Sequence, residues 1–310
     1  MYSGAAQPVN RNPIRVAPLV CGRYPFEVLR LARRGGARML KSDSSYLSLE
    51  QLPKGRAVLV VAHPGHELRV HGWLEAAKPV VFVLTDGSGG AGEPRLERTR
   101  QLLIRVGATP GGLFGRFSDR AIYQAILNGE FELFTSLIDE LTEEIAGQGS
   151  AYLVGDATEG YNPTHDVCRL MIDAAVAILR VKTGRLLPNF AFPLTGAPTV
   201  VPPSCATEPL RIDLDAEAYQ RKLQAAKHYE PLHDEVEKAN QAAGERAFQL
   251  ECLFPALPGS KTIMPTAEKP FYEKFGEGQV RAGRYQQVLE YRRHFLPLAE
   301  AVERYVQAAT

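Results

Sequence analysis

The segment Val58–Glu67, which reads VLVVAHPGHE, constrains this chain more than any other part of its sequence. Its first five residues are apolar and mostly β-branched, and two histidines and a glutamate then follow around a Pro-Gly pair. A short apolar run that ends at a chain breaker is typical of a buried strand in a parallel sheet. Ligands of open α/β sheets bind beyond the carboxyl ends of the strands, so we expect His63, His66 and Glu67 to lie at a functional site.

Strands, polar loops and helices alternate along the chain that follows. The hydrophobic pattern predicts strands at 57–62, 80–84 and 151–154 and helices at 67–77, 95–106 and 165–181. This order is that of right-handed βαβ units. The sequence therefore predicts an α/β fold of the Rossmann-like type, with a doubly wound, mostly parallel sheet and helices on both faces.

Three local expectations complete the outline. The glycine-rich segment 107–117 is expected to form a loop. Thr164 is expected to be the N-cap of the helix that starts at His165. The C-terminal part is expected to hold one helix over 283–308, with a break before Pro297.

Composition argues against several classes of function. A chain of 310 residues with 45% hydrophobic side chains can bury a large core, and a formal net charge of +1 gives no field that would attract nucleic acid or an anionic membrane. No apolar run approaches the roughly 20 residues that span a bilayer. The four cysteines are scattered, which suits a reducing compartment. We therefore expect a soluble, cytoplasmic protein that binds no nucleic acid.

Three histidines follow predicted strands. His63-x-x-His66 lies on one tight turn, and His165 lies after a later strand. Neutral imidazole is the commonest metal ligand, and catalytic zinc takes three protein ligands and keeps one position open. From spacing alone, a metal site and a set of ordinary loop and capping histidines are equally good interpretations. The remaining histidines are expected in solvent or packing roles: His71, His228, His233 and His294.

Four motifs together resemble those of the LmbE-like (PIG-L) de-N-acetylase family. The segment AHPGHE at 62–67 is similar to the family's A-H-P-D-D-E, and LTDG at 84–87 looks like its second-strand motif. The segment GYNPTH at 160–165 resembles its G-x-H-P-D-H, and Arg95 stands where the family has a substrate-contacting arginine. The chain is thus identified as a divergent member of this family.

The resemblance covers about residues 56–255, which suggests three parts. These are an N-terminal extension (1–55), an LmbE-like metal-dependent deacetylase domain (56–255) and a C-terminal helical extension (256–310). The family implies a Rossmann-like fold and a divalent metal, usually zinc, that activates water. Its reaction is the hydrolysis of an acetamido group on an amino-sugar conjugate.

Carried over position by position, the resemblance implies a metal site of three histidines. His63 matches the first metal histidine, His66 stands in place of a metal-binding aspartate, and His165 matches the last histidine. Asp86 and Arg95 are expected to make polar contacts with a sugar or phosphate. Asn162, in place of a family histidine, is expected to face the substrate as well.

Other departures from the family concern proton transfer. Gly65 occupies the position of the general-base aspartate, and Thr164 replaces an aspartate next to the metal histidine. General acid–base assistance is typically worth about 10²–10⁴-fold. Glu67, Asp166 or Glu159 could act as the catalytic carboxylate instead. Alternatively, His66 could be the base while Glu67 takes its place on the metal.

Two functions from different classes follow. The first is a metal-dependent hydrolase that removes an N-acetyl or other N-acyl group from a small amino-sugar conjugate. The second is a catalytically impaired relative that binds a sugar or glycoconjugate, or serves as a scaffold. A different metal hydrolase activity on the same scaffold is a weaker third interpretation, and a homo-oligomer is compatible with all three.

Overall fold

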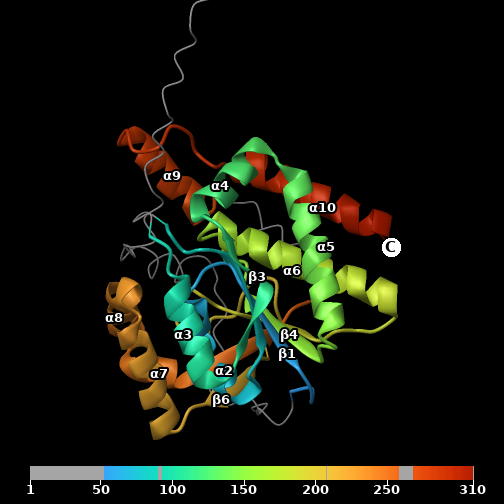
Figure 1. Cartoon of the computed structure of the whole chain (residues 1–310). Coiled ribbons are helices and arrows are strands. Elements are labelled where there is room, and N and C mark those ends of the chain that lie inside the picture. The colour runs from blue at the N-terminus through green and yellow to red at the C-terminus, as the bar shows by residue number, and fades with distance from the viewer. Residues whose placement is uncertain (1–51, 90–92, 207, 258–267, 310) are drawn as a thin grey trace, which may run out of the picture.

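The computed structural model describes residues 52–89, 93–206, 208–257 and 268–309. Its centre is a seven-stranded sheet in the order β3-β2-β1-β4-β5-β7-β6 (Figure 1). The strands are β1 (Ala57–Val61), β2 (Val80–Thr85), β3 (Thr109–Phe117), β4 (Tyr152–Asp156), β5 (Asn189–Phe192), β6 (Leu210–Asp213) and β7 (Leu250–Pro255). The strands from β3 to β5 pair in parallel, and β7 runs antiparallel to β5 and β6. The predicted α/β class with a mostly parallel sheet is confirmed.

Helices cover both faces of the sheet (Figure 1). One face carries α4 (Asp119–Asn128), α5 (Phe131–Gly147), α6 (Pro163–Thr183) and α10 (Leu296–Ala309). The other face carries α2 (His71–Ala77), α3 (Leu96–Val106) and α7 (Ala216–His228). The side chains of β1 explain this arrangement. Val58 and Val60 belong to the core on the first of these faces, whereas Leu59 and Val61 belong to the core on the other face. A strand that is apolar on both sides needs helices on both sides.

The strand order reverses between β1 and β4. From β1 the chain proceeds to β2 and β3 on one side, and β4 pairs with the other edge of β1 and leads on to β5. The loops that follow β1 and β4 therefore diverge at this point. Such a switch point is where open α/β sheets bind their ligands.

Segment 109–117 is a strand, β3, and the expectation of a loop was wrong. Its glycines serve packing: a Cβ on Gly111 would lie 2.4 Å from the ring of Phe82 on the neighbouring strand. Glycine weakens a strand but allows close approach of another side chain. Because β3 is an edge strand with several exposed residues, it also lacks the apolar run that marks β1 and β2.

Two further expectations need correction. The N-cap of α6 is Asn162, whose side chain accepts a hydrogen bond from the Thr164 N–H, with proline at the first helical position. The C-terminal part holds two helices instead of one, α9 (Phe271–Arg281) and α10, with a π-helical turn directly before α10. The backbone N–H of Tyr291 donates to Glu273 of α9, which anchors the linking segment.

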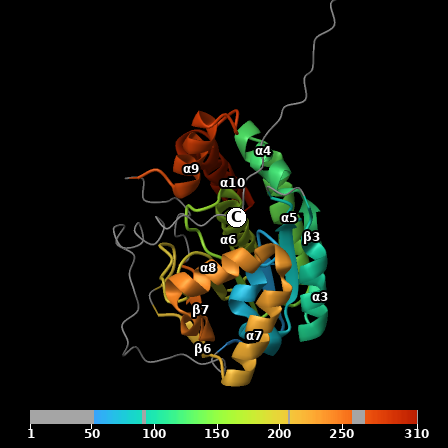
Figure 2. The same cartoon turned by 90° about the vertical axis from the view of Figure 1, so that its left-hand side faces the viewer.

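The C-terminal helices pack on the rest of the molecule. Helix α10 lies against α5 and α6, and Figure 2 shows α9 and α10 together at one end of the molecule. The ring of Phe271 in α9 stacks on Tyr161 with centroids 4.8 Å apart. The predicted domain boundaries near residues 55 and 255 stay predictions, and most of the predicted N-terminal extension lies outside the described residues.

Gly155 of β4 gives a first testable prediction. A Cβ at this position would lie 2.4 Å from Cδ1 of Ile172 and 2.8 Å from the backbone oxygen of Val60. We expect Gly155→Ala to lower the free energy of unfolding by about 1–3 kcal/mol, measured by urea denaturation. Gly147→Ala is the control, because nothing lies within 4 Å of its added methyl group. Equal urea midpoints for the two variants would contradict the packing described for β4.

Candidate functional site

Three imidazoles meet at the switch point between β1 and β4. His63 follows β1, His66 opens the 3₁₀ turn η2 (His66–Val70), and His165 lies in the first turn of α6 after β4. The ring centroids are 5.2 Å apart for His63 and His66, 5.0 Å for His63 and His165, and 4.6 Å for His66 and His165. The structure thus brings together the three histidines that were predicted as one group.

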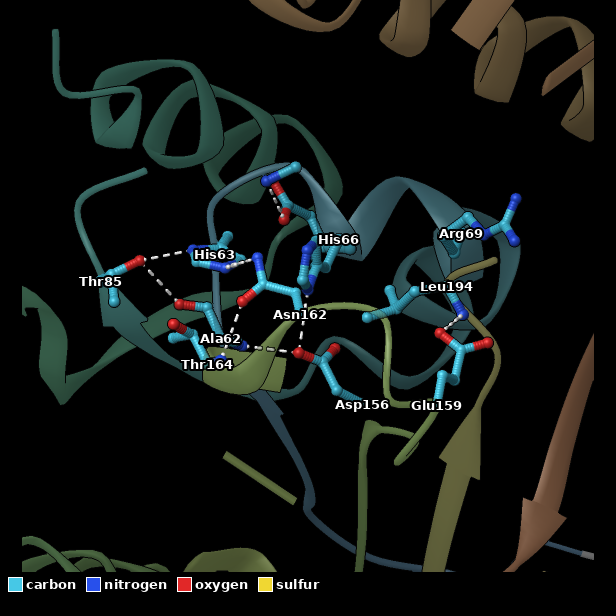
Figure 3. A network of polar contacts seen from close by, with 12 residues as sticks. Ala62, His63, His66, Arg69, Thr85, Asp156, Glu159, Asn162, Thr164 and Leu194 are labelled. Carbon is cyan, nitrogen blue, oxygen red and sulfur yellow. Dashed lines mark hydrogen bonds and ion pairs between the residues drawn. The ribbon is translucent and has the colours of Figure 1, made fainter. Parts of the chain in front are cut away.

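Two carboxylates hold the imidazoles of His63 and His66, and Figure 3 shows the one on His66, Asp156. His63 Nδ1 lies 2.8 Å from Asp119 Oδ1 and 2.7 Å from Thr85 Oγ1. His66 Nδ1 lies 2.9 Å from Asp156 Oδ2, which also accepts the Ala62 N–H at 2.7 Å. An ionised carboxylate only accepts hydrogen bonds, so each Nδ1 carries the proton and each Nε2 keeps its lone pair. This is the arrangement that carboxylates impose on metal-binding histidines.

The sequence reasoning missed both Asp119 and Asp156. Burial alone would raise the pKa of Asp119, but the charge and hydrogen bond of His63 hold it below its ordinary value. Burial raises the pKa of Asp156 to about 6. Their place after strands could have identified them, because each aspartate ends or follows a strand, as the three histidines do.

The pKa values of His66 and His165 lie well below that of a free imidazole. Burial is the main cause that lowers the pKa of each ring, and the neighbouring imidazoles lower it further. Within the described part of the chain, both ring nitrogens of His165 are buried and have no hydrogen-bond partner. An unpaired buried nitrogen costs free energy, so a ligand for His165 is expected.

The donor chemistry of the three imidazoles fits a divalent metal ion. Two of the rings are oriented by carboxylates, and the third is neutral with unused nitrogens. However, no group of three or more His, Cys, Asp or Glu side chains among residues 52–89, 93–206, 208–257 and 268–309 is arranged to hold a metal ion. The three side chains therefore fit a metal ion by their ligand type, and the assignment of His63, His66 and His165 as metal ligands stays a prediction.

Leu232 fills the space where a side chain at position 65 would project. Gly65 has φ 105°, and a Cβ on it would lie 2.2 Å from Cδ1 of Leu232. Leu232 ends the short 3₁₀ turn η3 (Glu230–Leu232), which leads into α8 (His233–Ala243). Position 65, where the resemblance implies a general-base aspartate, thus holds a glycine, and an apolar side chain closes the gap beside it.

The carboxylates that were expected to act in place of an aspartate at position 65 accept structural hydrogen bonds. Glu67 accepts from the Gly65 N–H at 2.7 Å and from the Thr99 hydroxyl at 2.6 Å. Asp166 accepts the N–H groups of Glu159 and Gly160, and Glu159 accepts from Leu194 and Thr195. Burial raises the pKa of Asp166 and of Glu159 to about 7. The catalytic roles of Glu67 and Asp166 stay predictions.

The polar residues expected to contact substrate occupy different places. Asn162 Nδ2 lies 3.4 Å from His63 Nε2, beside the histidine group (Figure 3). Arg95 is buried and lines the pocket that leads to His66 and His165. Asp86 Oδ1 accepts the Ser88 N–H at 2.9 Å, which gives it a role in the turn after β2. Their roles in substrate binding stay predictions.

A pocket with an empty volume of about 1040 Å³, part of it open to solvent, leads to the histidines. His66, His165, Arg95 and Tyr161 are among the residues that line it. Its other walls come mainly from apolar side chains of the loops and of α7 and α8: Leu194, Leu223, Leu232, Val236, Ala239 and Phe248. A concave, mostly apolar pocket with a few convergent polar groups is typical of small-molecule sites.

Asp119 gives a second testable prediction. If it orients a metal-binding His63, Asp119→Asn is expected to weaken zinc affinity about 10–100-fold, measured by competition with a zinc chelator. Asp213→Asn, which removes an exposed carboxylate on β6, is the control and is expected to bind zinc as the wild type does. Unchanged affinity in Asp119→Asn would exclude this role.

No family model and no curated protein matches the sequence. Among solved structures, the A40926 pseudoaglycone deacetylase is 20% identical with a TM-score of 0.45, and the match covers 66% of this chain and 97% of that one. The zinc-inhibited form of a teicoplanin deacetylase is 14% identical with a TM-score of 0.47, covering 66% and 98%. Similarities this distant do not establish a shared activity.

No helix in the part of the chain that the structure describes is long and apolar enough to cross a membrane.

Proposed function

We propose that this chain is a metal-dependent hydrolase of the LmbE-like type that removes an N-acyl group, such as acetyl, from an amino-sugar conjugate. The observation that carries the proposal is the group of three imidazoles with centroids 4.6–5.2 Å apart at the switch point of the sheet. The four family motifs support it, since their histidines converge there. The scattered cysteines are the reason for proposing a cytoplasmic location.

The residues of the site would have different roles in such a reaction. His63, His66 and His165 would hold the metal, which when bound polarises a carbonyl group and lowers the pKa of water. Asp119 and Asp156 keep the imidazoles of His63 and His66 in one tautomer. The guanidinium of Arg95 and the apolar pocket would orient the conjugate and exclude bulk water.

Hydrolysis is tested with the full chain and a panel of N-acetylated amino sugars, with released acetate as the readout. We expect turnover in the presence of zinc and none after exhaustive chelation, with recovery on adding zinc back. The proposal would be contradicted if neither N-acetyl nor longer N-acyl substrates were turned over in the presence of any metal tested.

A second candidate function is binding of a sugar or glycoconjugate without catalysis. The specific observation in its favour is the absence of a carboxylate at position 65, with Leu232 packed into the space. In that case the protein would bind an N-acetyl amino sugar in a calorimetric titration and would release no acetate.

A further inference from the structure

We propose that Glu235, on helix α8, is the carboxylate that accepts the proton of the attacking water in place of the missing residue at position 65. This inference rests on the proposed amide hydrolysis. It assigns a catalytic role to an element that none of the family motifs includes.

Glu235 lies in the wall of the pocket that reaches His66 and His165. Of the described residues that line the pocket at His66 and His165, Glu235 is the one carboxylate. It is placed there by the same turn that fills the gap beside Gly65, because Leu232 lies three residues earlier. Compared with the family pattern, the chain thus lacks the carboxylate at position 65 and has one on α8 instead.

The other carboxylates around the site already hold hydrogen-bond partners. Glu67, Glu159 and Asp166 accept backbone N–H groups in the surrounding loops. Asp119 and Asp156 hold the imidazoles of the metal-site histidines. A carboxylate so engaged cannot take up a proton without weakening the structure that holds the site.

The surroundings of Glu235 suit a general base. It is half-buried beside apolar neighbours in the pocket, and burial raises its pKa to about 7. The charges of Arg95, Lys238 and His63 act in the opposite direction, and Asp234 adds to the increase. A general base works best when its pKa lies near the working pH.

The proton balance of the step is simple. Water attacks the carbonyl carbon of the amide while Glu235 takes one proton from it. The C–N bond then breaks, and the protonated Glu235 returns the proton to the departing nitrogen. The products are a carboxylic acid and an amine, and Glu235 is again a carboxylate.

The test compares Glu235→Gln with Asp234→Asn, which removes the neighbouring exposed carboxylate. We expect Glu235→Gln to lower kcat about 10²–10⁴-fold, with wild-type zinc content and unchanged KM. In the wild type, kcat/KM should rise as the pH increases through about 7, because the base must be deprotonated. This rise should be absent in Glu235→Gln. Asp234→Asn is expected to keep wild-type kcat.

Two further measurements separate a catalytic role from a structural one. Formate is expected to restore part of the activity of Glu235→Ala, since a small carboxylate can enter the space left by the side chain. A ¹³C NMR titration of labelled glutamate should show the carboxyls of Glu159 and Glu235 titrating near pH 7, and only the second should disappear in Glu235→Gln.

The outcomes keep the two proposals apart. An active wild type with Glu235→Gln within threefold of its kcat would overturn the role of Glu235 and leave the hydrolase in place. A wild type without turnover on any N-acyl amino sugar would overturn the hydrolase, and the role of Glu235 with it.

Discussion

Replacing His165 by alanine is expected to abolish zinc binding and hydrolysis together. His165 is buried beside the other two imidazoles, and neither of its ring nitrogens has a hydrogen-bond partner in the described part of the chain. Loss of a direct ligand should cost more than the about 100-fold in affinity that loss of a supporting residue can cost. Zinc per chain after desalting, measured by elemental analysis, checks this.

The control is His228→Ala, which removes an exposed histidine of α7. It is expected to retain zinc and activity at the wild-type level. If His165→Ala retained one zinc per chain with wild-type affinity, the metal would have to lie elsewhere, and His165 would be an ordinary packing residue.

Glu67→Ala is expected to destabilise the protein. The Glu67 side chain is fully buried and accepts from the Gly65 N–H and the Thr99 hydroxyl, so its removal leaves the Gly65 N–H without this partner and the Thr99 hydroxyl with Tyr229 alone. A buried unsatisfied group costs about 1–3 kcal/mol, so we expect a loss of about 1–3 kcal/mol. The free energy of unfolding from urea denaturation is the measurement.

Glu143→Ala, on the exposed side of α5, is the matched control and is expected to unfold at the wild-type urea concentration. The more conservative Glu67→Gln tests the predicted catalytic role. If Glu67 is structural, this variant keeps its zinc and most of its turnover once folded. A decrease in turnover by about 100-fold or more, with intact zinc and stability, would instead identify Glu67 as the base.

Much of the scaffold could be predicted from the sequence because its signals are local. The apolar runs of β1 and β2 stop at polar loops, and the glycine at position 107 ends α3 with φ 77°. Strand β3 was not predicted, because its glycines are explained by side chains of other elements: Phe82 beside Gly111, Glu144 beside Gly112 and Leu96 beside Gly115. That information is tertiary and does not appear in the pattern of β3 itself.

The site was predictable only as far as its motifs extend. His63, His66 and His165 are marked by their place after strands, and the structure brings them together. Asp119 and Glu235 are brought to the site by α4 and α8, which carry no recognised motif. Their contribution depends on how distant segments pack, and spacing along the chain does not encode it.

The most direct test of the central claim is the location of the metal. A crystal of the zinc-loaded full chain, with diffraction recorded on both sides of the zinc absorption edge, gives an anomalous difference map. The account predicts one strong peak bound by the Nε2 atoms of His63 and His66 and by a ring nitrogen of His165. A zinc peak elsewhere, with the three imidazoles unliganded, would contradict it.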